Sequence, residues 1–373
     1  MNQPDARGCD IGAHAELVDR SWGAALAPRT DPAKETELAP VKSVQPRALR
    51  IVSIGGGTGL AMVLRGLARR GENQFGRARP SITGIVAMSD DGGSSGRLRR
   101  SRGCLPPGDI RKCLAALARR DSELSKIFRY RFSGAPGLAG HAVGNLLITA
   151  MAELKGDFLE AVKASAALLG ARGTVLPSTL APVELVAYKA DGACVVGERN
   201  LARAQGRVLR IDLRPKSPPA VDDAVEAIAG ADLISIGPGS LYSSVLPNLL
   251  VDGIATALRQ TTALKVWIAN LMTQPGETDG MDGADHLHAL IDHAGPVVDL
   301  TLINATPALP QAVERYARRG SQPVLFDRAA MVKAGVAALE VDLLRDGHLI
   351  RHDGRKVARR LLRLARCGLQ RKG

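Results

Sequence analysis

The chain has 373 residues, of which 45% are hydrophobic and 23% charged, a balance typical of a globular protein and not of a disordered one. Aromatic residues make up only 3%. Few side chains are therefore available to stack on bases, which argues against a nucleic-acid-binding protein. The formal charge of +13 comes mainly from residues 97–131 and 351–373. The first of these basic stretches follows a glycine-rich loop, which favours a small phosphorylated ligand.

Cysteine usage and hydropathy predict a cytoplasmic protein. The cysteines are odd in number, widely spaced and without a C-x-x-C pair: Cys9, Cys104, Cys113, Cys194 and Cys367. Neither a disulfide framework nor a zinc site is indicated, so a reducing compartment fits best. The N-terminus lacks the apolar region of a signal peptide, and no segment approaches the roughly 18 apolar residues of a membrane span. We therefore expect a cytoplasmic protein without a membrane span.

In chain order, residues 1–47 are mixed in charge, lack periodicity and predict a mobile arm. A single domain is predicted from residue 48 to 373, in which short apolar runs alternate with helical patterns. The predicted strands are 49–54, 82–88, 232–236, 265–269 and 298–303, and the predicted helices are 60–70, 110–120, 141–154, 158–169, 221–229 and 285–293. This alternation indicates an α/β fold with a mainly parallel sheet covered on both faces.

An antiparallel excursion is predicted at about residues 174–213. Residues 183–189 and 193–196 flank Asp191 and Gly192, which form a strong two-residue hairpin signal, and residues 208–213 supply a further strand. Basic and apolar residues interleave in the C-terminal segment, which predicts an amphipathic helix. That helix is either packed with a solvated basic face or a surface for nucleic acid or membrane.

The first glycine loop, residues 55–59, follows a strand and precedes a helix. Glycines allow close backbone approach, and helix N-terminal amides attract anions, so this loop predicts a phosphate cradle. The predicted contacts are Gly55, Gly56, Gly57, Thr58 and Gly59. Leu60 occupies the position of the last glycine in a dinucleotide fingerprint, which disfavours NAD. The alternative interpretation is a tight turn without a ligand.

The second glycine loop, residues 90–97, opens with two acids. Asp90 and Asp91 could hold ribose hydroxyls, or Mg²⁺ through water, and a structural alternative is that they cap the loop. The amides, hydroxyls and guanidinium that follow are anion receptors: Gly92, Gly93, Ser94, Ser95 and Arg97.

Three further polar residues lie close to predicted helix starts. Asp109 precedes an apolar periodic helix and is an N-cap candidate, with a ligand-binding role left open. His141 and Asn145 have the i, i+4 spacing that places two side chains on one helix face. His141 and Asn145 are candidates for ligand contact, although a lone histidine near a helix start is more often a cap or a packed residue than a catalyst.

The third glycine loop, residues 237–244, again follows a predicted strand. Gly237, Gly239, Ser240 and Tyr242 are the predicted phosphate or sugar contacts. Because the carboxyl ends of parallel strands lie along one edge of a sheet, we expect all three loops to face one shared diphosphate site.

Two later segments carry additional candidates. Asn270, Thr273 and Gln274 follow another strand and suit a uracil, guanine or sugar edge, although such a loop can also be plain polar surface. Arg351 could supply a cation to a phosphate. No H-E-x-x-H motif and no Walker lysine after the first glycine loop is present, which argues against zincins and ordinary P-loop NTPases.

Seven blocks together resemble the bacterial gluconeogenesis factor family, which is related to 2-phospho-L-lactate transferase. The blocks are Gly-Gly-Gly-Thr-Gly-Leu (55–60), Asp-Asp-Gly-Gly-Ser-Ser-Gly-Arg-Leu-Arg (90–99), Pro-Pro-Gly-Asp-Ile-Arg (106–111), Gly-His-Ala-Val-Gly-Asn-Leu-Leu (140–147), Leu-Pro-Ser-Thr (176–179), Ile-Gly-Pro-Gly-Ser-Leu-Tyr (236–242) and Met-Thr-Gln-Pro-Gly-Glu-Thr (272–278). Each block alone is weak, whereas seven in register from about residue 50 onward are specific.

The resemblance implies a Rossmann-like three-layer αβα fold. It also implies a cytoplasmic protein that binds a UDP-sugar such as UDP-N-acetylglucosamine and supports cell shape and wall synthesis during gluconeogenic growth, through a protein partner that the sequence does not identify. Whether the chain forms a homodimer is left open. This chain looks like the regulatory branch, which requires no cofactor.

The alternative function is that of the transferase relatives. They move a phospholactyl group from a guanosine diphosphate donor to a deazaflavin with Mg²⁺. In that case Asp90 and Asp91 would be the catalytic and Mg²⁺-binding residues, so the sequence leaves open whether the protein is an enzyme.

Overall fold

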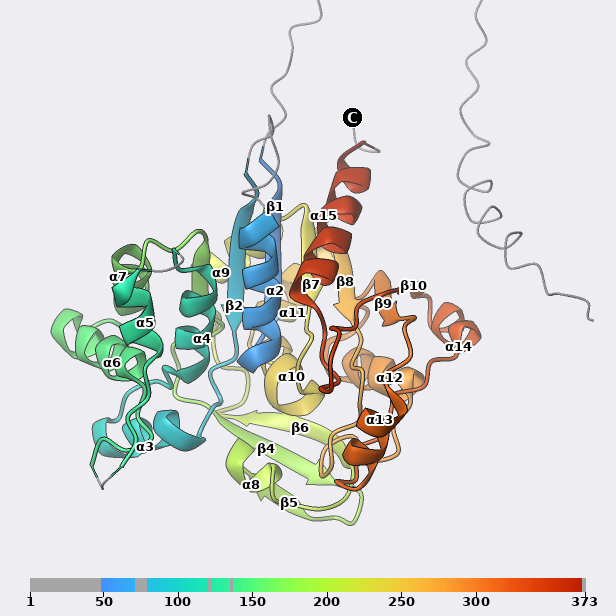
Figure 1. Ribbon diagram of the computed structural model, residues 1–373, viewed down its shortest axis with the longest axis horizontal. Helices are drawn as coiled ribbons and strands as arrows, with labels where there is room; N and C mark the ends of the chain where they lie inside the picture. The colour runs from blue at the N-terminus through green and yellow to red at the C-terminus, as the bar shows by residue number, and fades with distance from the viewer. Residues whose placement is uncertain (1–47, 71–78, 120–121, 135–136, 371–373) are drawn as a thin grey trace, which may run out of the picture. The chain divides into compact units, whose positions relative to one another are not determined.

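The computed structural model describes residues 48–70, 79–119, 122–134 and 137–370. The predicted arm, residues 1–47, lies outside the described residues. The central sheet has seven strands in the order β10-β9-β8-β7-β1-β2-β3, and every neighbouring pair is parallel (Figure 1). Their bounds are β1 Arg50–Gly55, β2 Ser81–Val86, β3 Thr174–Pro177, β7 Leu233–Ile236, β8 Leu264–Ile268, β9 Leu300–Asn304 and β10 Ala337–Val341. The predicted mainly parallel sheet is confirmed.

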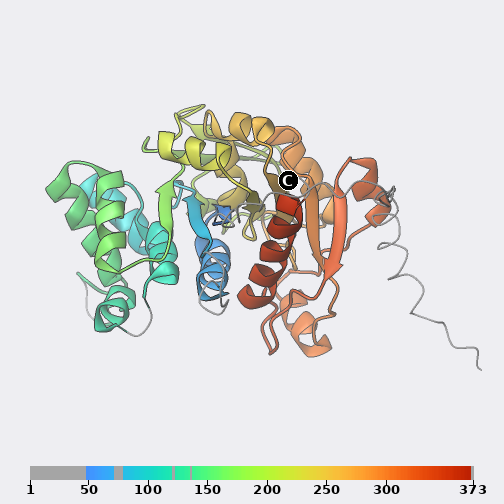
Figure 2. The same cartoon turned by 90° about the horizontal axis from the view of Figure 1, so that it is seen from above.

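Helices cover both faces of this sheet, which gives three layers (Figure 2). On one face lie α2 (Gly57–Arg70), α4 (Gly108–Leu117) and α15 (Gly354–Gln370). On the other lie α9 (Asp222–Ala229), α10 (Leu246–Leu249), α11 (Ile254–Gln260) and α12 (Gly283–Ala294). Strands such as β7 are therefore buried on both sides, which is why they are continuous apolar runs.

The remaining described helices lie along the edges and loops. They are α3 (Gly93–Arg102), α5 (Glu123–Arg129), α6 (Val143–Lys155), α7 (Phe158–Leu168), α8 (Glu198–Leu201), the π-helical turn η1 (Leu241–Val245), α13 (Pro310–Ala317) and α14 (Arg328–Lys333). None of the helices in the described ranges is both long and apolar enough to cross a lipid bilayer.

The strand order reverses between β1 and β7. From β1 the chain builds outward to β2 and β3, and it then returns to β7 on the other side of β1 before building outward through β8 to β10. In an open parallel sheet the loops at such a switch point diverge to opposite faces and leave a crevice at the carboxyl ends of the strands. The first and third glycine loops follow these two strands.

A separate antiparallel sheet has the order β5-β4-β6 and lies beyond the carboxyl ends of the parallel strands (Figure 1). It consists of β4 (Glu184–Lys189), β5 (Cys194–Val196) and β6 (Val208–Arg214). The hairpin around Gly192 is as predicted, but the excursion starts at Glu184 and not near residue 174. Thr174–Pro177 instead pairs with β2, because its buried apolar residues extend the main sheet.

The amphipathic C-terminal helix packs against α2 (Figure 1). Its apolar stripe is almost fully buried, with Val357, Leu361 and Leu362 no more than 3% exposed. Arg359 and Arg363 on the opposite side are exposed to solvent. The helix is therefore packed through its apolar stripe, with a basic face exposed to solvent, which is the first of the two alternatives predicted for it.

Candidate functional site

A hollow of about 690 Å³ opens at the switch point, at the carboxyl ends of β1, β7 and β8. We call it the switch-point hollow. The predicted site residues that line it are Thr58, Gly59, Gly239, Ser240, Asn270, Thr273, Gln274 and Arg351. Sequence segments more than 290 residues apart thus contribute to one cavity, which is of the size that small-molecule sites have.

The first and third glycine loops touch each other at the floor of this hollow. A Cβ at Gly59 would overlap the carbonyl oxygen of Pro238 and lie 2.8 Å from its carbonyl carbon. The backbone N–H of Gly237 donates to the carbonyl oxygen of Ile54 at 2.8 Å. Asn248 adds a bond from its Nδ2 to the Gly55 carbonyl oxygen at 3.1 Å. The glycine at position 59 is therefore required by close backbone approach.

The loop after β8 forms one wall. Asn270 donates through Nδ2 to the carbonyl oxygen of Gly239 at 2.9 Å, which ties this wall to the third loop. Thr273 is only 4% exposed, and its Oγ1 accepts from the Gln322 backbone N–H at 2.8 Å. Much of the hydrogen-bonding capacity predicted for ligand recognition is thus used to hold the loop, whereas no bond from the Gln274 side chain is present within the described residues.

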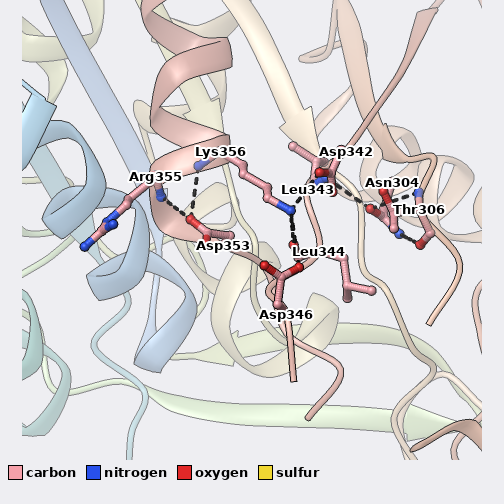
Figure 3. Close-up of polar contacts among 9 residues, drawn as sticks. All are labelled: Asn304, Thr306, Asp342, Leu343, Leu344, Asp346, Asp353, Arg355 and Lys356. Carbon is pink, nitrogen blue, oxygen red and sulfur yellow. Dashed lines mark hydrogen bonds and ion pairs between the residues drawn. The ribbon is translucent and has the colours of Figure 1, made fainter. Parts of the chain in front are cut away.

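The hairpin that carries Arg351 is held by a polar network at the start of α15 (Figure 3). Lys356 Nζ lies 2.7 Å from Asp342 Oδ2 and donates to the Leu344 carbonyl oxygen at 2.8 Å. Asp353 Oδ1 accepts from the backbone N–H groups of Arg355 at 2.6 Å and Lys356 at 3.1 Å. Because these contacts fix both ends of the hairpin, its side chains are held against the hollow.

His352 lies beside Arg351 in the same hairpin and also lines the hollow. Its Nε2 is 3.1 Å from the Ala269 carbonyl oxygen. Burial lowers the pKa of His352 to about 4. The imidazole is therefore neutral near pH 7, and the positive charge of this wall comes from arginines, namely Arg65, Arg319, Arg345 and Arg351.

Tyr242 does not line the switch-point hollow, contrary to the predicted ligand contact. Its side chain is 2% exposed, and its hydroxyl faces Met281 Sδ at 4.0 Å. Burial raises the pKa of Tyr242 to about 12. The phenol ring is part of the core because the π-helical turn directs it inward, whereas Ser240 just before that turn reaches the hollow.

Asp109 is not the N-cap of its helix, because α4 begins at Gly108 and its N-cap is Pro107. Its carboxylate instead accepts from the backbone N–H of Gly57 and forms an ion pair with Lys112 at 2.7 Å. Gly57 has a φ of +58°, a conformation that favours glycine and turns this N–H toward the carboxylate. Asp109 is thus hydrogen-bonded to the first loop, and the Gly57 N–H is used in this bond.

The two acids of the second loop have different partners. Asp90 Oδ1 accepts from the Gly92 N–H at 2.9 Å, and burial, with the nearby Asp109 carboxylate, raises the pKa of Asp90. Asp91 Oδ1 accepts from the Arg199 N–H at 2.8 Å, on the side of α8. The sequence pairs Asp90 with Asp91, but the structure pairs Asp90 with Asp109.

These carboxylates are the residues that could hold Mg²⁺. Within the described residues no group of three or more His, Cys, Asp or Glu side chains is placed to hold a metal ion. Mg²⁺ in nucleotide sites often takes only one or two protein carboxylates and completes its shell with phosphate oxygens and water. Asp90 and Asp109 fit that pattern better than the predicted pair of adjacent acids.

The rest of the second loop lines a different cavity. Gly93, Ser94 and Arg97 border a hollow of about 500 Å³ together with Arg100, Arg131, Gly140 and Arg199. We call it the arginine hollow. It shares no lining residue with the switch-point hollow. Of the three loops expected to share one site, the first and third line one hollow, whereas Gly93, Ser94 and Arg97 of the second loop line another. Asp90, at the start of the second loop, lies beside Asp109 and so close to the first loop.

His141 and Asn145 meet at Ser94, although not by the predicted helix face. His141 precedes α6, which begins at Val143, so the pair is not i, i+4 within one helix. His141 Nδ1 lies 3.0 Å from Ser94 Oγ, and Asn145 Nδ2 donates to the same oxygen at 3.0 Å. Ser95 is occupied structurally, since its Oγ accepts from the Gly108 N–H at 3.0 Å.

Sequence reasoning missed several residues that the structure brings to these sites. Tyr316, Arg319 and Arg345 line the switch-point hollow from segments without any glycine motif. Glu277, within the Met-Thr-Gln-Pro-Gly-Glu-Thr block, lines neither hollow; its Oε1 accepts from Ser243 Oγ at 3.2 Å, and burial raises its pKa to about 7. The block itself was the available signal for Glu277, whereas nothing local marks Arg319 or Arg345.

A parallel sheet covered on both faces, with glycine loops meeting at its switch point, defines a Rossmann-like α/β protein. A family model described as 2-phospho-L-lactate transferase CofD matches residues 51–344. The gluconeogenesis factor of Halalkalibacterium halodurans is 42% identical over 315 residues, which cover 84% of this chain and 95% of that protein. The gluconeogenesis factor of Bacillus subtilis is 40% identical over 317 residues, covering 84% of this chain and 98% of that protein.

A crystal structure of a protein from Bacillus halodurans matches with a TM-score of 0.80 and 40% identity, covering 85% of this chain and 99% of the other. The chain belongs to the gluconeogenesis factor family, which shares the CofD family model.

Proposed function

We propose that the protein binds a UDP-sugar such as UDP-N-acetylglucosamine in the switch-point hollow and acts in the cytoplasm as a regulatory factor for cell shape and wall synthesis during gluconeogenic growth. The observation that carries the proposal is the meeting of the first and third glycine loops in one hollow lined by arginines. Such a surface suits a dianionic diphosphate flanked by a base and a sugar.

The residues that line the switch-point hollow offer a ligand different kinds of contact. Thr58 and Ser240 offer hydroxyl groups beside the backbone of the glycine loops, where a diphosphate would be received. Arg351 and Arg345 reach the same hollow from the terminal hairpin and would neutralise its charge. Gln274, with amide donors and an acceptor, suits the edge of a uracil ring.

Isothermal titration calorimetry with UDP-N-acetylglucosamine tests this proposal directly. We expect binding to the full chain and a loss of about tenfold or more in Arg351→Gln, because a charge-assisted contact to phosphate is removed. Arg363→Gln is the matched control, since Arg363 is an exposed arginine on the solvent face of α15. Absence of binding at millimolar UDP-N-acetylglucosamine, or an equal loss in both variants, would refute the proposed site.

The second candidate function is phosphoryl-group transfer of the 2-phospho-L-lactate transferase type. It is favoured by the closeness of Asp90 and Asp109 beside Lys112 at the first loop and by the matching family model. In this case Asp90 and Asp109 would hold Mg²⁺, which would neutralise charge on the phosphates. Purified protein with Mg²⁺, a guanosine diphosphate donor and a deazaflavin acceptor gives the test, and turnover lost in Asp109→Asn would support transfer.

We further propose that the protein acts through a protein partner. Cross-linking and affinity purification from cells grown on a gluconeogenic carbon source, with Arg351→Gln as the ligand-deficient comparison, would identify a partner whose capture depends on the ligand. Light scattering with and without UDP-N-acetylglucosamine would report whether the chain is a homodimer. If wild type and Arg351→Gln capture the same partner equally, binding of that partner does not depend on the ligand site.

A further inference from the structure

The arginine hollow concentrates positive charge, and none of its lining residues is acidic. Arg97, Arg100, Arg131 and Arg199 all line it. Within the described residues, none of these four guanidinium groups forms an ion pair with a carboxylate. Four like charges around one cavity repel each other, and an anion between them would remove that repulsion.

Two of the arginines are held in place by the loop opposite α3. Arg97 donates to the Ala139 carbonyl oxygen at 2.7 Å, and Arg131 donates to the carbonyl oxygen of Gly140. A guanidinium has five N–H donors, so one bond orients each group and leaves further donors for a ligand. The charge in the hollow is therefore carried by positioned side chains.

A buried polar cluster lies behind Ser94, which lines the hollow. Ser94 is 5% exposed, His141 8% and Asn145 2%. The Ser94 hydroxyl oxygen receives the Asn145 amide and lies against His141 Nδ1, so it can accept from both and direct its own proton into the hollow. Asn145 Oδ1 is buried there without a hydrogen-bond partner. A buried, incompletely satisfied polar cluster under a charged cavity is a feature of a binding site.

We propose that the arginine hollow is a second ligand site, which binds a small organic phosphate carrying an additional anionic group. The phosphate would lie at the N-terminus of α3 against Gly93 and Ser94, where free N–H groups and the helix dipole favour an anion. Arg97, Arg100, Arg131 and Arg199 would surround it. The volume of about 500 Å³ exceeds the needs of a single phosphate ion, which is why the ligand is an organic phosphate.

This site goes beyond the proposed nucleotide site and does not rest on it, because the two hollows share no lining residue. The second anionic group follows from the excess of guanidinium groups over what one phosphate engages. A bidentate contact uses one arginine for each pair of oxygens, so four arginines suit two anionic groups.

The test is calorimetric titration with two probes, 3-phosphoglycerate and glycerol 3-phosphate, which are three-carbon phosphate esters that differ in one carboxylate. We expect 3-phosphoglycerate to bind with a Kd below about 1 mM and glycerol 3-phosphate about tenfold more weakly. Saturating UDP-N-acetylglucosamine should leave both affinities unchanged. Competition between the nucleotide and the phosphate probe, or no binding of either probe at about 10 mM, would overturn the proposal.

Arg100→Gln is the informative variant, because no hydrogen bond from this side chain holds the fold in the described residues. We expect it to weaken 3-phosphoglycerate by about tenfold, and Arg131→Gln to do the same. Arg102→Gln is the control: Arg102 lies on the same helix, is 63% exposed, approaches Glu153 at 4.0 Å and does not line the hollow. An equal loss in Arg102→Gln would show a general charge effect and no site.

His141 offers a second readout. Its pKa is lowered by burial and by the positive charges of Arg97 and Arg131. An anion among those arginines would offset their charge, so the His141 pKa measured by NMR should rise when 3-phosphoglycerate is added and stay unchanged in Arg100→Gln at the same concentration. A bound phosphoserine peptide with higher affinity than both small probes would overturn the assignment to a small organic phosphate.

Discussion

Gly59→Ala tests whether the contact between the first and third glycine loops forms the switch-point hollow. The added Cβ would lie 2.8 Å from the Pro238 carbonyl carbon and closer still to its oxygen. Ordinary contacts of this kind begin near 3.4 Å, so the carbonyl carbon must recede by about 0.6 Å, and the third loop must recede further still to clear the closer carbonyl oxygen. Backbone cannot rotate away as a flexible side chain can, and the two loops must therefore separate.

Overpacking of this kind typically costs about 1–3 kcal/mol. Position 59 lies in the first turn of α2, where alanine is intrinsically better than glycine by up to about 1 kcal/mol, which offsets part of the cost. We expect a net loss of about 1–2 kcal/mol in the free energy of unfolding. For a chain of this size that corresponds to a fall in Tm of roughly 2–6 °C, together with a loss of UDP-N-acetylglucosamine affinity of about tenfold.

Thermal and urea unfolding with calorimetric titration give both quantities. Gly368→Ala is the matched control, because no heavy atom lies within 4 Å of a Cβ at that helical position. It should be neutral or stabilising by up to about 1 kcal/mol and should leave affinity unchanged. If Gly59→Ala unfolds at or above the wild-type temperature and binds UDP-N-acetylglucosamine equally well, the close contact of the loops does not form the site.

Three further predictions concern individual side chains. Burial raises the pKa of Glu277 from 4.5 to about 7, so the folded protein binds a proton that the unfolded chain has lost, and the free energy of unfolding falls as pH rises between these values. Relative to wild type, Glu277→Gln should therefore gain roughly 2–3 kcal/mol in the free energy of unfolding at pH 8 and little at pH 4. Equal urea midpoints of the two proteins at pH 8 would contradict this. Asp353→Ala removes the cap of α15 and should cost about 0.5–2 kcal/mol, whereas Asp353→Asn should retain most of the stability; a neutral alanine variant in urea unfolding would argue against the cap. His352, with a pKa of about 4, should stay neutral by NMR at pH 5–8. The free energy of unfolding should fall as pH drops from about 6.5 to 4, because the imidazole binds a proton in the unfolded chain before it does so in the folded protein. Titration of His352 near pH 6.5 in the folded protein would disprove its burial.

Much of the architecture was predictable from local patterns. The apolar runs at β1, β7 and β8 are buried on both faces, and such runs between helical patterns indicate a parallel sheet whatever the order of its strands. The hairpin at Gly192 was predictable for the same reason, since its turn chemistry is local. Boundaries were less certain: Thr174–Pro177 has the same apolar character as a hairpin strand, and only its pairing with β2 assigns it to the main sheet.

Local sequence specifies which segments form glycine loops and therefore which stretches of backbone can approach a phosphate. Which residues share a cavity depends on the fold: the switch point between β7 and β1 brings the first and third loops together, whereas Gly93, Ser94 and Arg97 of the second loop lie beside Arg131 and Arg199. Two residues have other roles than predicted: Asp109 is bonded to the first loop and does not cap its helix, and Tyr242 is buried in the core and does not line the site. Local chemistry fixes what a residue can bind, whereas its neighbours across the sheet depend on long-range packing that no short motif encodes.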